Sequence, residues 1–191
     1  MKLRRATVDD AQTLSRLARE TFYDTFVGTC TDEDMRGYLA ETYSVEKLRQ
    51  ELSDPEDLVF LAETANELDP EPSGPVGYLR MKEGSEGLPS SKQWKALECK
   101  RLYVRKEFHR KGVAQLLMDH FMNYALQNHY EVVWLGVWEF NYRAQRFYSK
   151  YGFVPNGHSH PFPIQNTPQT DIWLWRFLTD PSFERTEGAG E

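Results

Sequence analysis

Cysteine is scarce in this sequence, and its scarcity limits the chemistry that the chain can carry. The 191 residues include two cysteines, Cys30 and Cys99, which are 69 positions apart and have no CxxC or CxxH partner. Two such residues cannot form the disulfide framework of a small secreted domain, and they lack the spacing of a zinc site. We therefore expect reduced thiols, a cytoplasmic setting and no bound metal.

Long apolar runs are also missing. The first residues, MKLRRATVDD, contain no hydrophobic stretch of the secretory type, and the longest apolar run is VVWLGVW at 132–138. That run is far shorter than the roughly 20 residues that cross a bilayer. The 40% hydrophobic content is enough for one core of single-domain size. We expect one soluble domain over 1–180, away from membranes, followed by a flexible tail at 181–191.

The chain as a whole has no excess of positive charge, but its basic residues are concentrated in one place. The formal net charge is −6, yet residues 100–111 hold six Lys or Arg against the single acid Glu107. Residues 31–98 show the reverse, with sixteen Asp or Glu against seven Lys or Arg. A nucleic-acid-binding protein needs an extended basic face, so this class is disfavoured. A local cluster indicates one small anionic ligand instead.

Hydrophobic periodicity predicts alternating strands and helices. Strands are expected at 2–7, 58–62, 76–81, 97–104 and 132–138 and from Phe153 and Gln169 onward, and helices up to Phe26, at 32–43 and 45–52, from Val113 to about Tyr124, and at 141–150. The connections at 65–75 and 83–91 have loop composition. This order predicts an α/β fold in which a mixed central sheet of six or seven strands is flanked by helices.

The turn HRKGVA, residues 109–114, lies between a predicted strand and a predicted helix. Glycine at such a turn lets successive backbone N–H groups point at one spot, and the helix dipole adds about half a positive charge there. Arg110 and Lys111 add charge at its rim. The turn is neither a GxxxxGK[ST] loop nor a GxGxxG loop. It predicts a pyrophosphate site, although a basic loop that makes solvated ion pairs is the alternative.

A second motif, NYRAQRFYSKYGF at 141–153, follows the strand VVWLGVW. Asn141 and Tyr148 are two helical turns apart and share one face, with the small Ala144 between them. Gly152 is suited to end the helix. Such a face suits a long, slender ligand, whereas the alternative is that Phe147 and Tyr148 are ordinary core aromatics.

Together, LYVRKEFHRKGVAQLLM and NYRAQRFYSKYGF resemble the acetyl-CoA-binding and acceptor-side motifs of the GNAT family of N-acetyltransferases. The likeness covers most of the chain, and WLGVWEFN and PQTDIWL are most similar to the bacterial spermine/spermidine acetyltransferase branch. The resemblance implies the GNAT fold and an acyltransferase that moves the acetyl group of acetyl-CoA directly to a primary amine, either a polyamine or another small amine.

The resemblance also implies roles for individual residues. Tyr148 corresponds to the tyrosine that protonates the departing CoA thiolate. The residues that correspond to the cofactor site are Leu102, Tyr103, Val104, His109, Arg110, Lys111, Gly112, Val113, Ala114, Asn141, Ala144 and Phe147. His109 stands where the family usually has Gln or Arg. We therefore expect backbone groups, and not this side chain, to hold the pyrophosphate.

The reaction also needs a base, because a primary amine is almost wholly protonated at neutral pH. Glu98 is the first candidate, since strand alternation places it on the face of Leu102 and Val104 unless a bulge intervenes. Glu139, at the end of VVWLGVW, is the second. For either carboxylate the alternative is a surface ion pair.

The acidic segment 31–57 suggests how a polycation could be bound. Its charge, together with cation–π contacts from nearby aromatic rings, would suit several ammonium groups, although acidic helix faces are often simply solvated. The aromatic residues concerned are Tyr23, Phe26, Tyr38 and Tyr43.

Four further residues are given structural roles. His158 and His160 share one face of a predicted strand, but no third ligand has suitable spacing, so we expect no metal there. Trp173 and Trp175 also share a strand face and suit either the core or a subunit contact. A homodimer is thus left open.

Two alternatives to an acetyltransferase of small amines remain. One is an acyl-CoA-binding regulatory protein with little catalysis, and the other is an enzyme that acts on protein amines. The presence of both Asn141 and Tyr148 favours catalysis, because a sensor has no use for a proton donor beside the sulfur.

Overall fold

Seven strands form one mixed sheet in the computed structural model, which describes residues 1–64, 74–84 and 94–178. The strands are β1 (Lys2–Arg5), β2 (Asp57–Glu63), β3 (Pro75–Glu83), β4 (Ala96–Val104), β5 (Val132–Trp138), β6 (Val154–Pro161) and β7 (Thr170–Phe177). Their order across the sheet is β1-β2-β3-β4-β5-β7-β6, and only the β4–β5 pair is parallel. The predicted α/β class is confirmed.

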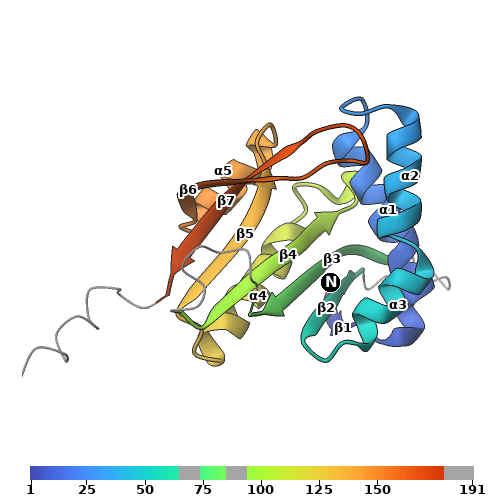
Figure 1. Cartoon of the computed structure of the whole chain (residues 1–191). Coiled ribbons are helices and arrows are strands. Elements are labelled where there is room, and N and C mark those ends of the chain that lie inside the picture. Colours follow the sequence, from blue (N-terminus) through green and yellow to red (C-terminus); the bar gives the residue numbers. More distant parts are fainter. Residues whose placement is uncertain (65–73, 85–93, 179–191) are drawn as a thin grey trace, which may run out of the picture.

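Helices cover both faces of this sheet (Figure 1). They are α1 (Ala11–Phe26), α2 (Asp32–Thr42), α3 (Val45–Ser53), α4 (Val113–Gln127) and α5 (Tyr142–Lys150), with short 3-10 turns at Val8–Asp10 and Lys106–Phe108. The first three helices pack around one buried cluster, and α4 and α5 pack around the other. Within the described ranges, every helix is too short or too polar to cross a bilayer.

Local chemistry explains why these elements begin and end where they do. The Thr31 hydroxyl accepts the Asp34 N–H and starts α2, and the Ser44 hydroxyl accepts the Lys47 N–H and starts α3. Gly152, at φ +76°, ends the α5 region as expected. All predicted strands and helices are present. Most of the predicted loops at 65–75 and 83–91 lies outside the described residues. The predicted tail at 181–191 lies entirely outside them.

The centre of the sheet opens between β4 and β5. These parallel strands pair over three positions only, from Ala96 opposite Val132 to Glu98 opposite Trp134. Beyond this point β4 continues beside β3 and β5 continues beside β7, so the two strands diverge (Figure 1). The facing edge of β4 after Glu98 therefore has no strand partner, which leaves backbone groups ready to pair with an extended ligand.

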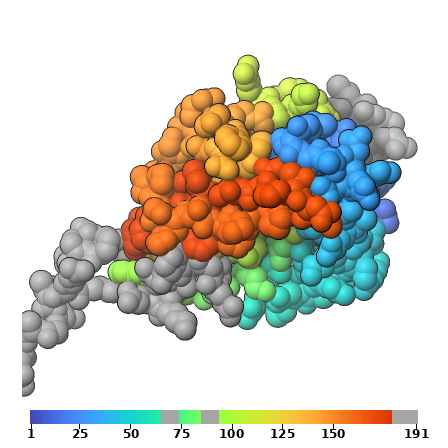
Figure 2. Space-filling view, turned by 45° about the horizontal axis from the view of Figure 1, so that its top comes forward, coloured from blue at the N-terminus to red at the C-terminus, as the bar shows by residue number. Residues whose placement is uncertain are grey.

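The segment between β6 and β7, residues 162–169, reaches back to the N-terminal helices, and we call it the strap. Its Ile164 side chain is fully buried among residues of the α1–α3 cluster. The Asp34 carboxylate of α2 accepts hydrogen bonds from the Thr167 hydroxyl at 2.7 Å and from the Asn166 side-chain amide at 3.0 Å. Figure 2 shows the β6–β7 hairpin, in orange-red, against the blue and cyan helices.

We predict that Gly77→Ala lowers the stability of the fold, because β3, β4 and α4 meet at this glycine. An added Cβ would lie 2.9 Å from the Tyr103 carbonyl oxygen and 3.1 Å from Val113 Cγ1. Overpacking of this kind costs about 1–3 kcal/mol. The measurement is the urea midpoint of unfolding.

The matched control is Gly37→Ala in α2. There the added Cβ meets only the flexible Gln165 side chain, at 3.2 Å, and alanine favours a helix by about 1 kcal/mol. Its midpoint should stay the same or rise. Equal midpoints for the two variants would contradict close packing at Gly77.

Candidate active site

A single cleft of about 900 Å³ follows the gap between β4 and β5 and continues to the N-terminal helices. Its two ends differ in chemistry. One end carries basic side chains, namely Arg110, Arg143, Arg146 and Lys150. The other end carries aromatic side chains, namely Phe22, Phe26, Tyr38, Tyr43, Trp138 and Phe162. An elongated ligand with an anionic end therefore fits the cleft in one orientation.

The glycine turn lies at the basic end. Gly112 is the N-cap residue of α4 with φ +82°, and Arg110 also has a positive φ of 63°. No side chain of the described residues caps this helix, so the first N–H groups of α4 keep their hydrogen-bonding capacity. Together with the helix dipole and the arginine, these donors form a site for a phosphate group.

His109 braces this turn against β4. The Arg143 guanidinium donates to its Nδ1 at 2.8 Å, so Nε2 carries the proton and donates to the Val104 carbonyl at 2.9 Å. Burial and the neighbouring guanidinium lower the pKa of His109, which keeps this neutral form at pH 7. The side chain thus holds protein groups in place, which accords with the expectation that backbone donors face the ligand.

Helix α5 forms the opposite wall. Asn141 is its N-cap, and the side-chain oxygen accepts the Ala144 N–H at 3.1 Å. The carboxamide therefore offers its remaining N–H donors to the cleft, which suits the carbonyl groups of an amide-containing ligand. Ala144 and Phe147 line the same wall, and the small alanine lets a ligand approach the helix.

Tyr148 lies at the middle of the cleft and is 8% exposed. Burial raises the pKa of its phenol, and the nearby Cys99 and Asp171 act in the same direction. The phenol is therefore a proton donor at neutral pH. Burial also raises the pKa of the Cys99 thiol, which lines the cleft beside it. A protonated thiol is a weak nucleophile, so Cys99 is unsuited to accept an acyl group.

Most of the residues that the resemblance assigned to the cofactor line this cleft. They are Leu102, Tyr103, Val104, His109, Arg110, Gly112, Ala114, Asn141, Ala144 and Phe147. Lys111 and Val113 do not line it. The Lys111 ammonium lies over the Phe108 ring, 5.1 Å from its centroid, and the Val113 side chain is fully buried in the core. Val113 contributes only its backbone N–H, at the first turn of α4.

Neither predicted base reaches the cleft. A bulge at Lys100 breaks the alternation of β4, because Arg101 pairs with Arg80 whereas Cys99 pairs with Met81. Glu98 consequently leaves the face of Leu102 and Val104. It is buried and forms an ion pair with Lys100 at 2.7 Å. Glu139 is half-buried at the end of β5, and it too lies outside the cleft lining.

Asp171, which the sequence reasoning missed, is the one acidic residue among the described residues that line the cleft. This β7 residue lies opposite Trp138 of β5 and lines the cleft. Gly136 leaves room for it, since a Cβ there would come within 3.0 Å of the Asp171 carboxylate. Burial raises the pKa of Asp171 to about 6. Two sequence signals could have found it: an aspartate in an apolar strand, and a glycine inside the strand VVWLGVW.

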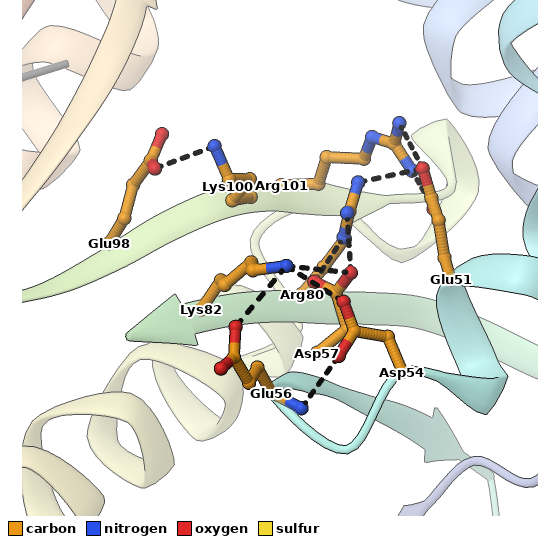
Figure 3. A network of polar contacts seen from close by, with 9 residues as sticks. All are labelled: Glu51, Asp54, Glu56, Asp57, Arg80, Lys82, Glu98, Lys100 and Arg101. Carbon is orange, nitrogen blue, oxygen red and sulfur yellow. Dashed lines mark hydrogen bonds and ion pairs between the residues drawn. The ribbon is translucent and has the colours of Figure 1, made fainter. Parts of the chain in front are cut away.

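The carboxylates of the acidic segment 31–57 do not line the cleft. Tyr38, Tyr43 and Phe26 line the aromatic end as expected, whereas Tyr23 is exposed to solvent. Glu51 is buried between two arginines of the neighbouring strands (Figure 3). No acidic residue of this segment is among the lining residues of the described chain.

The two histidines and two tryptophans near the end of the sheet, His158, His160, Trp173 and Trp175, are not among the residues that line the cleft. His158 and His160 are both exposed, and the His160 ring stacks on Trp173 at 5.9 Å. In the part of the chain that the structure describes, no three His, Cys, Asp or Glu residues form a metal site. Trp173 and Trp175 are half-buried and pack against the cluster that contains Trp134.

Comparisons with known proteins agree with this geometry. Residues 15–153 match a family model described as acetyltransferase (GNAT) family. An uncharacterized N-acetyltransferase in the pepI 3'region of Lactobacillus delbrueckii is 28% identical over 178 residues, which cover 93% of this chain and 98% of the relative. A spermidine N(1)-acetyltransferase of Thermoplasma acidophilum is 26% identical over 121 residues, 62% of this chain and 66% of the relative.

Solved structures share the fold. PaiA N-acetyltransferase from Thermoplasma acidophilum, in complex with coenzyme A, has a TM-score of 0.72 at 22% sequence identity. The match covers 92% of this chain and 98% of the PaiA chain. Arabidopsis thaliana NAA60, in complex with a bisubstrate analogue, has a TM-score of 0.71 at 14% sequence identity. The match covers 93% of this chain and 99% of the NAA60 chain.

We predict that Gly112→Ala weakens coenzyme A binding about 5- to 30-fold, because alanine disfavours the left-handed backbone by roughly 1–2 kcal/mol and the free turn relaxes to a conformation that no longer points its N–H groups at the anion. Gly157→Ala provides the control. Gly157 has a similar φ of +86°, has no atom within 4 Å of an added Cβ, and lies in β6 outside the cleft lining. Calorimetric titration should show a change of affinity for the first variant only, and equal losses for both would argue against the turn as the anion site.

Proposed function

The chain belongs to the acetyltransferase (GNAT) family and is an N-acetyltransferase, and we propose that it moves the acetyl group of acetyl-CoA directly to a small primary amine. The observation that carries this proposal is one continuous cleft that joins an uncapped, basic helix start to a buried phenol and a buried carboxylate. Each part matches one requirement of the transfer: an anion site, a proton donor and a proton acceptor.

The basic end suits coenzyme A. We assign the diphosphate to the N–H groups at the start of α4, with Arg110 and Arg143 beside it. The free edge of β4 and the Asn141 amide suit the two amide groups of the pantetheine arm. The complex of PaiA with coenzyme A supports this assignment.

Tyr148 is the proposed proton donor to the departing thiolate. A free thiol has a pKa of about 8.5 and a tyrosine about 10, so transfer requires the two values to come closer. The cleft raises the pKa of a thiol, as it does for Cys99, because burial disfavours the thiolate. A CoA thiolate formed beside Tyr148 is subject to the same burial and gains basicity in the same way. Because burial raises the pKa of the Tyr148 phenol too, the phenol stays protonated until this strongly basic thiolate forms beside it.

Asp171 is the proposed acceptor of the ammonium proton, in place of Glu98 or Glu139. With a pKa of about 6, it is mostly ionised at neutral pH and is still a better base than an exposed aspartate. It lies between the aromatic end and Tyr148, where the amine must arrive to attack the thioester. Removal of this proton gives the neutral amine that reacts.

Among small amines, a polyamine is supported by the spermidine N(1)-acetyltransferase relative. A regulatory protein with little catalysis is less consistent with Tyr148 and Asp171, which a sensor does not need. We place the reaction in the cytoplasm, since Cys30 and Cys99 are both free thiols. A homodimer through the face of Trp173 and Trp175 stays a prediction.

We predict that Tyr148→Phe lowers kcat about 100-fold or more while the Kd for acetyl-CoA changes little, because only the proton donor is lost. The rate of thiol release and calorimetric titration are the two measurements. Tyr124→Phe is the control, since Tyr124 is a half-buried tyrosine of α4 outside the cleft lining. An unchanged kcat in Tyr148→Phe would remove the assigned role.

We predict that Asp171→Asn abolishes the acidic limb of the pH profile of kcat, which the wild-type enzyme should show near pH 6. The substitution should also stabilise the fold at high pH. A folded pKa raised from 3.8 to about 6 means that the wild type loses stability as pH rises through 6, by up to about 3 kcal/mol. Urea unfolding at pH 4 and pH 8 measures this difference.

Asp10→Asn is the control with the opposite sign. The Arg4 guanidinium holds the pKa of Asp10 at about 2, so this carboxylate stabilises the fold above pH 4 and its stabilising effect is lost as pH falls through 2. Asp10→Asn should therefore be less stable than the wild type at pH 8. If Asp171→Asn were also less stable at pH 8, a raised pKa at Asp171 would be excluded.

A further inference from the structure

We infer that the acceptor is a primary amine with one positive charge on an apolar body, and not a polyamine with several charges. This inference rests on the proposed function, because it names the substrate class of the same cleft. It comes from the aromatic end, where the packed rings and the charges of the lining residues point to the same class.

The aromatic end is a box of packed rings. The Phe22 ring stacks on Phe26 at 4.5 Å and on Tyr38 at 4.7 Å, and Phe162 meets Tyr38 edge-on at 5.9 Å. Trp138 closes the box against Phe26 at 5.1 Å. Rings arranged in this way favour an apolar or aromatic group through burial and edge-to-face contact.

Only one carboxylate among the described lining residues serves this end, and it is Asp171. Two cationic side chains of β4 also line the cleft: Lys100, whose ammonium pairs with Glu98 at 2.7 Å, and Arg101, whose guanidinium lies over the Tyr43 ring, 4.9 Å from its centroid. Arg101 donates to both carboxylate oxygens of Glu51, at 2.7 and 3.2 Å. The charge of Arg101 is therefore already neutralised inside the protein.

The neighbouring ion pairs of Arg80 with Glu51 and Asp57 also have no unpaired charge (Figure 3). Arg80 donates to Glu51 at 2.8 Å and to both oxygens of Asp57, each at 2.8 Å. Two arginines thus meet two buried carboxylates, and neither carboxylate is left for a substrate. The net charge that the box presents to an acceptor is that of Asp171 alone, which matches a single ammonium group.

A polyamine would bring further ammonium groups into this box. The desolvation penalty of a buried ion that lacks a counterion is larger than the stabilisation that one cation–π contact provides. The acidic groups on α2 do not compensate, because none of them is among the described residues that line the cleft. Additional positive charges are thus disfavoured here.

The test compares acceptors that differ in one charge. Hexylamine and 1,6-diaminohexane have the same chain length, and only the diamine carries a second ammonium group. With wild-type enzyme and acetyl-CoA, kcat/KM for thiol release should be at least about tenfold higher for hexylamine, since one unpaired charge exceeds 1.4 kcal/mol. 2-Phenylethylamine should exceed spermidine by a similar factor or more.

The outcomes separate the two proposals. A higher kcat/KM for 1,6-diaminohexane and spermidine would overturn the substrate class while the acetyltransferase function stood. Tight binding of acetyl-CoA without thiol release for any of the four amines would overturn the proposed function itself.

An added carboxylate should weaken the preference. Thr25 of α1 lines the cleft and is half-buried, so Thr25→Glu places a second negative charge beside the box. The ratio of kcat/KM for the diamine over the monoamine should rise about tenfold. Thr13→Glu, on the same helix but outside the lining, should leave the ratio unchanged. An unchanged ratio in Thr25→Glu would also count against the inference.

Discussion

The structure depends on the divergence of β4 and β5. These two parallel strands pair over three positions and then separate. After Glu98 and Trp134, each strand keeps only its outer partner, so the sheet stays continuous at its base and opens above it. The opening exposes the backbone edge of β4 inside the molecule. It also lets α4 begin and α5 run along the same gap. Donors from three elements thereby face one elongated space, which no single motif could provide.

Burial inside this gap sets the chemistry of its titratable groups. The same low-dielectric surroundings raise the pKa of Tyr148, of Cys99 and of Asp171. The consequences differ by group: the phenol stays protonated, the thiol stays unreactive, and the carboxylate becomes a base suited to neutral pH. One physical cause therefore acts on both the proposed donor and the proposed acceptor of protons, and it also discourages a covalent route through the protein thiol.

The acceptor side shows how charge can be kept out of a pocket that lies among charged residues. Arg101 would repel an amine if it stood alone, but Glu51 binds both of its terminal nitrogens. The strap is held in a comparable way, because Asp34 accepts from its residues and so keeps Phe162 against the aromatic rings. Polar groups outside the box stabilise its walls while the interior stays apolar, and this division determines which amines it suits.

Local patterns in the sequence were enough to predict the strands, the helices and the turn that is proposed to bind the diphosphate. Hydrophobic periodicity is local, so it predicts the seven strands and five helices, and a glycine before an apolar helix identifies the turn at Gly112. Which carboxylate lines the cleft depends on contacts between strands that are distant in the sequence. A single bulged residue, Lys100, moves Glu98 to the other face, and register between strands is not readable from one strand. Asp171 reaches Gly136 only because β7 returns to pair with β5, a contact between residues far apart in the chain that local patterns cannot predict.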